Sequence, residues 1–258
     1  MDEQERSPPC RLESLMLECA PSMSHPALRA IIFDFNGVIA DDETAHFITF
    51  QEALREDGLH LTKEEYYGRY LGMDERNCLA ALLADRADGP NPDRQQRIHK
   101  RKASLFYAYT QRQTPPLFPG VIRLITRAMQ QYRLAIASGG RREQILRALR
   151  GTSIEHAFRV LVSAEDIAIG KPDPAIYRYT LERLNARRQQ AELPVRPQEC
   201  VVVEDSVAGI AAGRAADMKV VGVATTYPAE HLTRAHLVLP SLEEVSLDRL
   251  EALFTERD

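Results

Sequence analysis

An apolar run that ends in a carboxylate is the part of this sequence best suited to chemistry. Residues 30–35 read Ala-Ile-Ile-Phe-Asp-Phe, and Gly37 follows shortly after Asp34. A short run of β-branched and aromatic residues predicts a buried strand, and in open parallel sheets ligands bind beyond the carboxyl ends of strands. Asp34 therefore stands where a nucleophile would meet a substrate. An aspartate beside a glycine turn can also serve only as a helix cap, so other segments must decide between these roles.

Three further segments place polar side chains after apolar runs or inside turns. Glycines after a hydroxyl residue can turn their backbone N–H groups toward an anion at a helix start. A lysine that precedes a proline is kept out of helical geometry, and two adjacent acids can end a buried strand. The segments carry, in order, Ser138 with Gly139 after residues 134–137, Lys171 within 170–174, and Glu204 with Asp205 after 201–203.

The chemistry of these side chains is complementary. Asp34, Glu204 and Asp205 at one sheet edge would repel one another and raise their pKa values unless a cation neutralised them. Mg²⁺ suits such a site because it binds a few carboxylates and leaves positions for a substrate phosphate. Lys171 would add positive charge for phosphate oxygens, and Ser138 a hydrogen bond. Attack by a carboxylate on phosphorus would divide one difficult transfer into two easier steps.

In sequence order, these segments resemble the four motifs of the haloacid dehalogenase superfamily. The resemblance extends from about Ala30 to about Leu242. Within the superfamily, the chain is similar to the branch of β-phosphoglucomutases and sugar-phosphate phosphatases. The stretches that carry this second likeness are 41–46, 118–121 and 204–210.

The resemblance implies a fold, a cofactor and a substrate class. The fold is α/β, a Rossmann-like doubly wound parallel sheet with an inserted α-helical cap. The cofactor is Mg²⁺, bound by the side chains of Asp34 and Asp205 and by the backbone carbonyl of Asn36, while Glu204 supports the waters of the metal. The substrate is a small phosphorylated metabolite, such as a sugar phosphate, with Asp34, Asn36, Ser138 and Lys171 as catalytic positions.

Position 36 departs from the family pattern. Phosphatases and mutases of the family carry a second aspartate here, which protonates the leaving oxygen and later activates water, whereas this chain has Asn36. A carboxamide keeps the shape of the side chain but has no titrating proton near neutral pH. Loss of a positioned general acid/base typically costs ~10²–10⁴ in rate. We therefore expect slow hydrolysis.

Four explanations of Asn36 stay open. In the first, the chain is a slower phosphatase in which His46 or Asp42 of the hinge takes over the proton transfer. In the second, its chemistry differs, as in the dehalogenase and phosphonatase branches. In the third, it binds a phosphorylated ligand without turning it over, and in the fourth it is an inactivated form of an enzyme. A phosphoglucomutase-like phosphotransferase is a further alternative. Phosphonatase chemistry needs a cap lysine, and the candidates, each expected at the surface, are Lys63, Lys100 and Lys102.

The spacing of the predicted strands indicates an inserted domain. Almost a hundred residues of helical character separate the first strand from the run at 134–137, whereas a plain crossover needs only a dozen or more. Asp41-Asp42 opens the insertion and residues 114–117, Thr-Pro-Pro-Leu, close it. After residue 118, helices and strands alternate, which predicts a parallel sheet with helices on both faces. The expected division is a tail at 1–27, a core at 28–41 with 118–258, and a cap at 42–117.

Substrate selection is expected in the cap. Residues 72–76 resemble the specificity loop of the family, and Arg76 and Lys102 are candidates for binding the remote part of the substrate. His46 and, outside the cap, Gly139 are further substrate-binding candidates. Glu75 occupies the place where a mutase arginine is expected. This difference weakens the mutase interpretation and favours simple hydrolysis.

Composition is typical of a cytoplasmic enzyme. The 258 residues carry a formal net charge of −4, which gives no basic footprint for nucleic acid. No apolar stretch approaches the ~20 residues of a membrane span. The cysteines at positions 10, 19, 78 and 200 show no metal-ligand spacing and are expected to be free thiols. The oligomeric state does not follow from the sequence.

Overall fold

The computed structural model describes residues 27–70, 75–86, 91–190 and 192–255, with the side chains of 75–77 left out. The expected tail, most of the specificity loop and two of the four cysteines lie outside these residues. The other two, Cys78 and Cys200, are buried, and neither is in a disulfide within the described part of the chain. Among the described helices, none combines the length and apolar character that crossing a membrane requires.

A parallel sheet of six strands forms the centre of the fold, in the order β3-β2-β1-β4-β5-β6. Chain order reverses on either side of β1, and the crevice at such a switch point is where open α/β sheets bind ligands. The strands are β1 (Ala30–Phe33), β2 (Arg133–Ala137), β3 (Val160–Val162), β4 (Cys200–Glu204), β5 (Lys219–Val223) and β6 (Leu237–Leu239).

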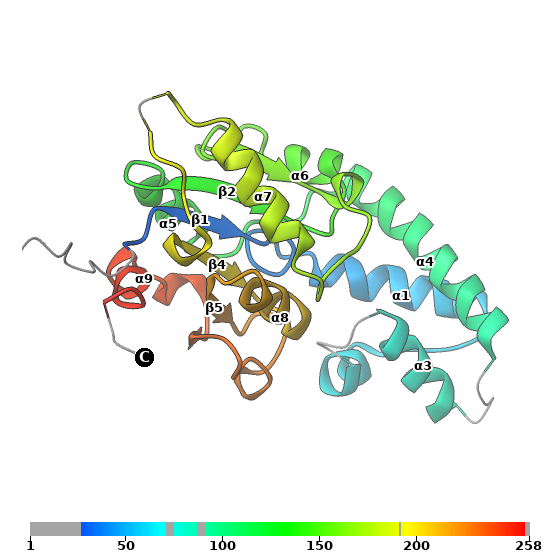
Figure 1. The fold of residues 1–258 in the computed structure, drawn as a ribbon. Helices are drawn as coiled ribbons and strands as arrows, with labels where there is room; N and C mark the ends of the chain where they lie inside the picture. Colours follow the sequence, from blue (N-terminus) through cyan, green and yellow to red (C-terminus); the bar gives the residue numbers. More distant parts are fainter. Residues whose placement is uncertain (1–26, 71–74, 87–90, 191, 256–258) are drawn as a thin grey trace, which may run out of the picture.

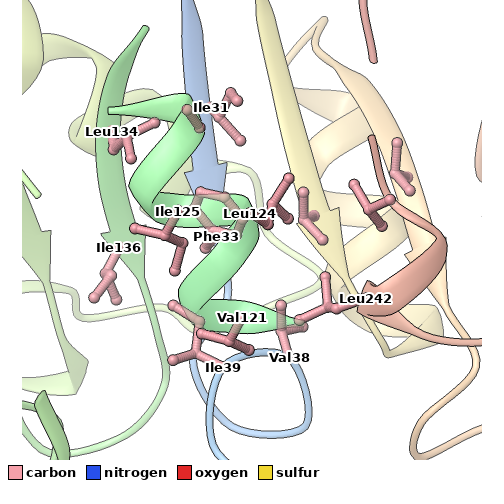
Figure 2. Packing of buried hydrophobic residues seen from close by; sticks show 14 of the residues in the cluster. Ile31, Phe33, Val38, Ile39, Val121, Leu124, Ile125, Leu134, Ile136 and Leu242 are labelled. Carbon is pink, nitrogen blue, oxygen red and sulfur yellow. The ribbon is translucent and has the colours of Figure 1, made fainter. Parts of the chain in front are cut away.

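Alternating side chains of the strands build a core on each face of the sheet. Ile31 and Phe33 of β1 belong to one buried cluster, and Ala30 and Ile32 to another, as the two-residue repeat of a strand requires. Figure 2 shows the first cluster, in which side chains of the helix that starts at Val121 lie over β1 and β2. Because both faces are apolar, both must be covered by helices.

Helices cover both faces of the sheet (Figure 1). Apolar residues of α5 (Val121–Ala128), α6 (Arg142–Leu149) and α9 (Leu247–Ala252) join the cluster of Figure 2. Those of α7 (Ala175–Ala186) and α8 (Val207–Ala215) join the cluster on the opposite face. The predicted class, a doubly wound Rossmann-like sheet, is confirmed.

A helical insertion stands beyond the carboxyl end of β1 (Figure 1). It has its own buried apolar cluster, separate from the two clusters of the sheet. Two connecting segments join it to the sheet side by side, since Asp41 N donates to Pro116 O at 2.8 Å and Phe118 N to Ile39 O at 3.0 Å. The helices are α1 (Glu43–Glu56), α2 (Lys63–Glu65), a π-helix at Tyr66–Tyr70, α3 (Glu75–Asp85) and α4 (Pro92–Arg112).

Two elements differ from expectation for local reasons. The sequence predicts a helix over 95–110 in the cap, but α4 begins at Pro92, because Asn91 caps it by accepting from Arg94 N at 3.0 Å. Asparagine followed by proline is thus a helix start here and not only a break. Strand β6 was not predicted, because its apolar run is short and stands alone.

Candidate active site

The carboxyl ends of β1 and β4 bring the predicted acids together. The two strands are hydrogen-bonded neighbours in which Phe33 pairs with Val203, and Asp34 N donates to Val203 O at 2.9 Å. The next residues on each strand, Asp34 and Glu204, therefore leave the sheet side by side. This pairing explains why acids 170 positions apart meet at the switch point.

Lys171 lies between these two carboxylates. Its Nζ is 2.6 Å from Glu204 Oε1, to which it donates a hydrogen bond, and 2.8 Å from Asp34 Oδ1. Burial alone would lower the pKa of Lys171, but both carboxylates raise it above its usual range, so the ammonium stays charged. Burial raises the pKa of Asp34 to about 6 against the opposing charge of Lys171. Among the described residues, Asp34 Oδ1 has no hydrogen-bond partner besides the Lys171 ammonium.

Glu204 is fully buried and held on both oxygens. Oε1 accepts from Lys171 and, at 2.7 Å, from Tyr177 OH, while Oε2 accepts from the backbone N–H and hydroxyl of Ser206 at 3.0 and 2.9 Å. Burial would raise the pKa of Glu204, but Lys171 and these hydrogen bonds lower it. A Cβ at Gly209 would lie 1.8 Å from Oε1, so only glycine admits the carboxylate at the start of α8.

Asp205 is buried next to two other acids. Burial, followed by the charges of Glu204 and Asp34, raises its pKa well above the usual value. Gly37, with φ +74°, passes so close that a Cβ there would lie 2.0 Å from Asp205 Oδ2. The loop after β1 therefore wraps around this carboxylate.

The three acids form a cluster that fits a divalent cation. One oxygen from each of Asp34, Glu204 and Asp205 lies within 4.8 Å of the others. With Lys171 as the adjacent ammonium, the cluster when ionised keeps two uncompensated negative charges, which are costly to bury. A hard cation bound by oxygens would remove this cost.

Asn36 and the predicted phosphate loop are brought together. Gly140 N donates to Ser138 Oγ at 3.0 Å. A Cβ at Gly140 would lie 3.2 Å from Ser138 Oγ and 3.4 Å from Asn36 Oδ1. The carboxamide of Asn36 therefore packs against this loop, next to the predicted nucleophile.

A cavity of about 330 Å³ opens above the acids. It contains the predicted Asp34, Asn36, Ser138 and Lys171, with Gly139 and His46 in its wall. Several residues of this wall were not predicted. Four come from helices of the insertion, whose packing has no local signal, and two from the segments that follow β4 and β5. These missed residues are Glu43, Phe50, Tyr66, Cys78, Ser206 and Thr226.

Lys102 is buried and turned toward His46. Its exposed fraction is 1%, so the expected surface position is wrong, whereas Lys63 and Lys100 are exposed as expected. Lys102 Nζ lies 2.6 Å from His46 Nδ1 and 4.8 Å from the ring centre of Phe106. Its aliphatic stem and charge are thus packed inside the helical insertion.

A second cavity of about 580 Å³ adjoins the first. Both cavities share Asn36, His46 and Gly139, and Lys102 and Arg141 line the second. The Arg141 guanidinium lies over the Tyr107 ring, 5.2 Å from its centre.

Arg76, another cap residue predicted to bind substrate, is in α3, but its side chain lies outside what the structure describes.

Comparison with known proteins identifies related sequences over most of the chain. A family model described as haloacid dehalogenase-like hydrolase matches residues 28–217. A phosphorylated carbohydrates phosphatase from Thermotoga maritima is 30% identical over 194 residues, 74% of this chain and 83% of that protein. The β-phosphoglucomutase of Bacillus subtilis is 27% identical over 227 residues, 86% of this chain and 94% of that protein.

A solved structure agrees with these sequence matches. A variant of the protein CbbY from Rhodobacter sphaeroides, in complex with xylulose 1,5-bisphosphate, superposes with a TM-score of 0.65. It is 27% identical, and the match covers 87% of this chain and 99% of that one. Sequence motifs, sequence relatives and fold therefore indicate the same branch.

Proposed function

The chain belongs to the haloacid dehalogenase-like hydrolases, and on that basis we propose that it is a Mg²⁺-dependent phosphatase of a small phosphorylated metabolite, a sugar phosphate in particular. The observation that carries the proposal is the position of Lys171 between Asp34 and Glu204 at the floor of the cavity. Relatives named as a phosphorylated carbohydrates phosphatase and a β-phosphoglucomutase support the substrate class.

Asp34 is the proposed nucleophile. Its carboxylate lines the cavity, and the charge of Lys171 opposes the rise in its pKa that burial causes. Attack on the substrate phosphorus would break the bond to the leaving oxygen and form an aspartyl-phosphate. Lys171 and the loop at Ser138 would orient phosphate oxygens, which is the main task in phosphoryl transfer. Water would then hydrolyse the aspartyl-phosphate.

Asp34 and Asp205 are the proposed metal ligands through their side chains, and Asn36 through its backbone carbonyl. When bound, Mg²⁺ neutralises the acids and the charge that develops on phosphate. Glu204 has both oxygens engaged by protein donors, so its proposed role is to position Lys171 and the backbone at Ser206. The helical insertion would close over the substrate and exclude water.

Asn36 favours one alternative, a protein that binds a phosphorylated ligand with little turnover. Its carboxamide occupies the cavity beside the phosphate loop, where it can hydrogen-bond but cannot transfer a proton near neutral pH. An intact Asp34 and Lys171 would serve binding as well as reaction. The two functions therefore differ in one measurable quantity, the rate of phosphate release.

Phosphate release from a panel of sugar phosphates, with and without Mg²⁺, tests the proposal. We expect slow, metal-dependent release that Asp34→Asn abolishes, and an increase of up to ~10²–10⁴ in Asn36→Asp. Release by Asn36→Asp but none by the unaltered chain would favour the binding protein. Phosphate release that persists in Asp34→Asn, or whose rate does not depend on Mg²⁺, would contradict the proposed mechanism.

A further inference from the structure

Asn36 leaves the proposed reaction without a proton carrier, and the cavity wall contains other ionisable side chains. Within the described part of the chain, the carboxyl and imidazole groups that line the cavity with Asp34, outside the acid cluster, are those of Asp42, Glu43 and His46. Thiols and phenols normally keep their protons at neutral pH. The choice therefore lies among three side chains at the start of α1.

His46 and Asp42 are engaged with each other. His46 Nδ1 lies 2.6 Å from Lys102 Nζ. His46 Nε2 lies 3.3 Å from Asp42 Oδ2. Both ring nitrogens of His46 therefore face protein groups, and Asp42 Oδ2 faces one of them.

Glu43 is differently placed. Oε1 accepts from Tyr66 OH at 2.6 Å, and no donor of the described residues reaches Oε2. Oε2 is also absent from the buried oxygens that lack a partner, so it is accessible to solvent in the cavity wall. The carboxyl group is therefore oriented by one oxygen and open at the other, which is the arrangement a general acid/base needs.

Several neighbouring elements act on the pKa of Glu43. Burial has the largest effect and raises this pKa. The hydrogen bond from Tyr66 of the π-helix and the charges of His46 and of Lys102 in α4 lower the pKa, whereas the charge of Asp42 raises it. The net result is a pKa above that of an exposed glutamate. A raised pKa brings a carboxyl group closer to the working pH of a proton carrier.

We propose that Glu43, held by Tyr66, is the general acid/base that replaces the missing aspartate at position 36. The inference rests on the proposed phosphatase function. In the first step, Asp34 attacks phosphorus, the P–O bond to the leaving group breaks, and protonated Glu43 gives its proton to the leaving oxygen. In the second step, ionised Glu43 takes a proton from water, which attacks the aspartyl-phosphate and releases phosphate with Asp34 restored.

A double variant separates proton transfer from substrate binding. We expect Glu43→Gln to lower kcat/KM for an alkyl phosphate by about 10² or more in the unaltered chain, but by less than about 10 when Asn36→Asp supplies a carboxyl group of its own. Glu56 is an exposed glutamate at the end of the same helix, so Glu56→Gln is the matched control and should have no effect. Equal losses in both backgrounds, or no loss at all, would overturn the inference.

The pH profile gives a second readout. Because Glu43 must be protonated for the first step, kcat/KM should decline as the pH rises through its pKa, and Glu43→Gln should remove that decline. Tyr66→Phe removes a hydrogen bond that lowers this pKa, so the decline should move to higher pH. A profile unchanged in Tyr66→Phe would count against Glu43, even if Glu43→Gln failed to fold.

An aryl phosphate tests the proposed function separately. The leaving group of p-nitrophenyl phosphate departs without a proton, so Glu43→Gln should keep the first-turnover release of p-nitrophenolate and lose steady-state turnover. Asp34→Asn should lose both. If the unaltered chain shows no first-turnover release, the phosphatase proposal itself fails; if Glu43→Gln also loses that release, only the role of Glu43 is wrong.

Discussion

Lys171 Nζ lies 2.6 Å from Oε1 of Glu204, a carboxylate with no exposed surface. Removing the ammonium would leave Glu204 and the adjacent Asp34 buried without their counter-charge. Breaking a buried ion pair in this way costs roughly 3–5 kcal/mol. We therefore expect Lys171→Met to lower the unfolding free energy by about that amount in urea denaturation, while exposed Lys63→Met has little effect. Equal stability of the two variants would contradict this account of the site.

Gly209→Ala should damage the same site from another direction. The added Cβ would lie 1.8 to 2.2 Å from the carboxyl atoms of Glu204, so the carboxylate or the start of α8 must move. Overpacking of this kind lowers the free energy of unfolding by about 1–3 kcal/mol. The rate of phosphate release should also fall, because the displaced Glu204 no longer positions Lys171. Gly68→Ala has no atom within 4 Å of its added Cβ and is the control; a similar loss there would show that the effect is general.

Stability should fall as pH rises and should recover with Mg²⁺. Burial raises the folded-state pKa of Asp34 to about 6, from 3.8, and raises that of Asp205 as well. The folded state thus holds these protons more tightly than the unfolded state. The resulting stabilisation is complete below the pKa of the unfolded state and is lost as pH rises through the raised pKa of the folded state.

Mg²⁺ competes with the protons that these carboxylates bind, so it should stabilise the fold more at about pH 7.5 than at about pH 5. At a hundred times its dissociation constant, the gain is about 2.7 kcal/mol. Thermal unfolding at both pH values, with and without the metal, is the measurement. Asp34→Asn should show a smaller dependence on both variables. A metal effect that is equal at the two pH values would mean that Mg²⁺ does not bind these acids.

Lys102→Met tests whether the buried lysine contacts substrate. Methionine keeps much of the volume, so the unfolding free energy should change by less than about 1.5 kcal/mol. If the ammonium binds an anionic part of the substrate, its loss removes a charged hydrogen bond of about 1.5–3 kcal/mol, seen as a rise in KM of roughly ten- to a hundredfold. Lys100→Met, exposed on the same helix, should leave KM unchanged. An unchanged KM in Lys102→Met would assign Lys102 a structural role.

Much of the fold was predictable because its signals are local. The apolar runs at 30–33 and 201–203 predict strands from residue type alone, before any neighbouring strand is known, and Lys171 before a proline predicts a turn. The helix starts were less reliable, as Asn91 shows, because a capping asparagine resembles a break until its hydrogen bond is seen. The division into core and cap, and the motion of the cap, stay predictions.

The sequence by itself determined the strand ends, the order of the four motifs and the substitution at Asn36, since these depend on residue type and short spacing. Only the tertiary structure decided that Glu43 and Tyr66 share a cavity with Asp34, and that Lys102 is buried against His46. The physical reason is that helices of the insertion pack through side chains far apart in the chain. Their periodicity indicates which face is apolar, but not which polar group that packing turns toward the cavity.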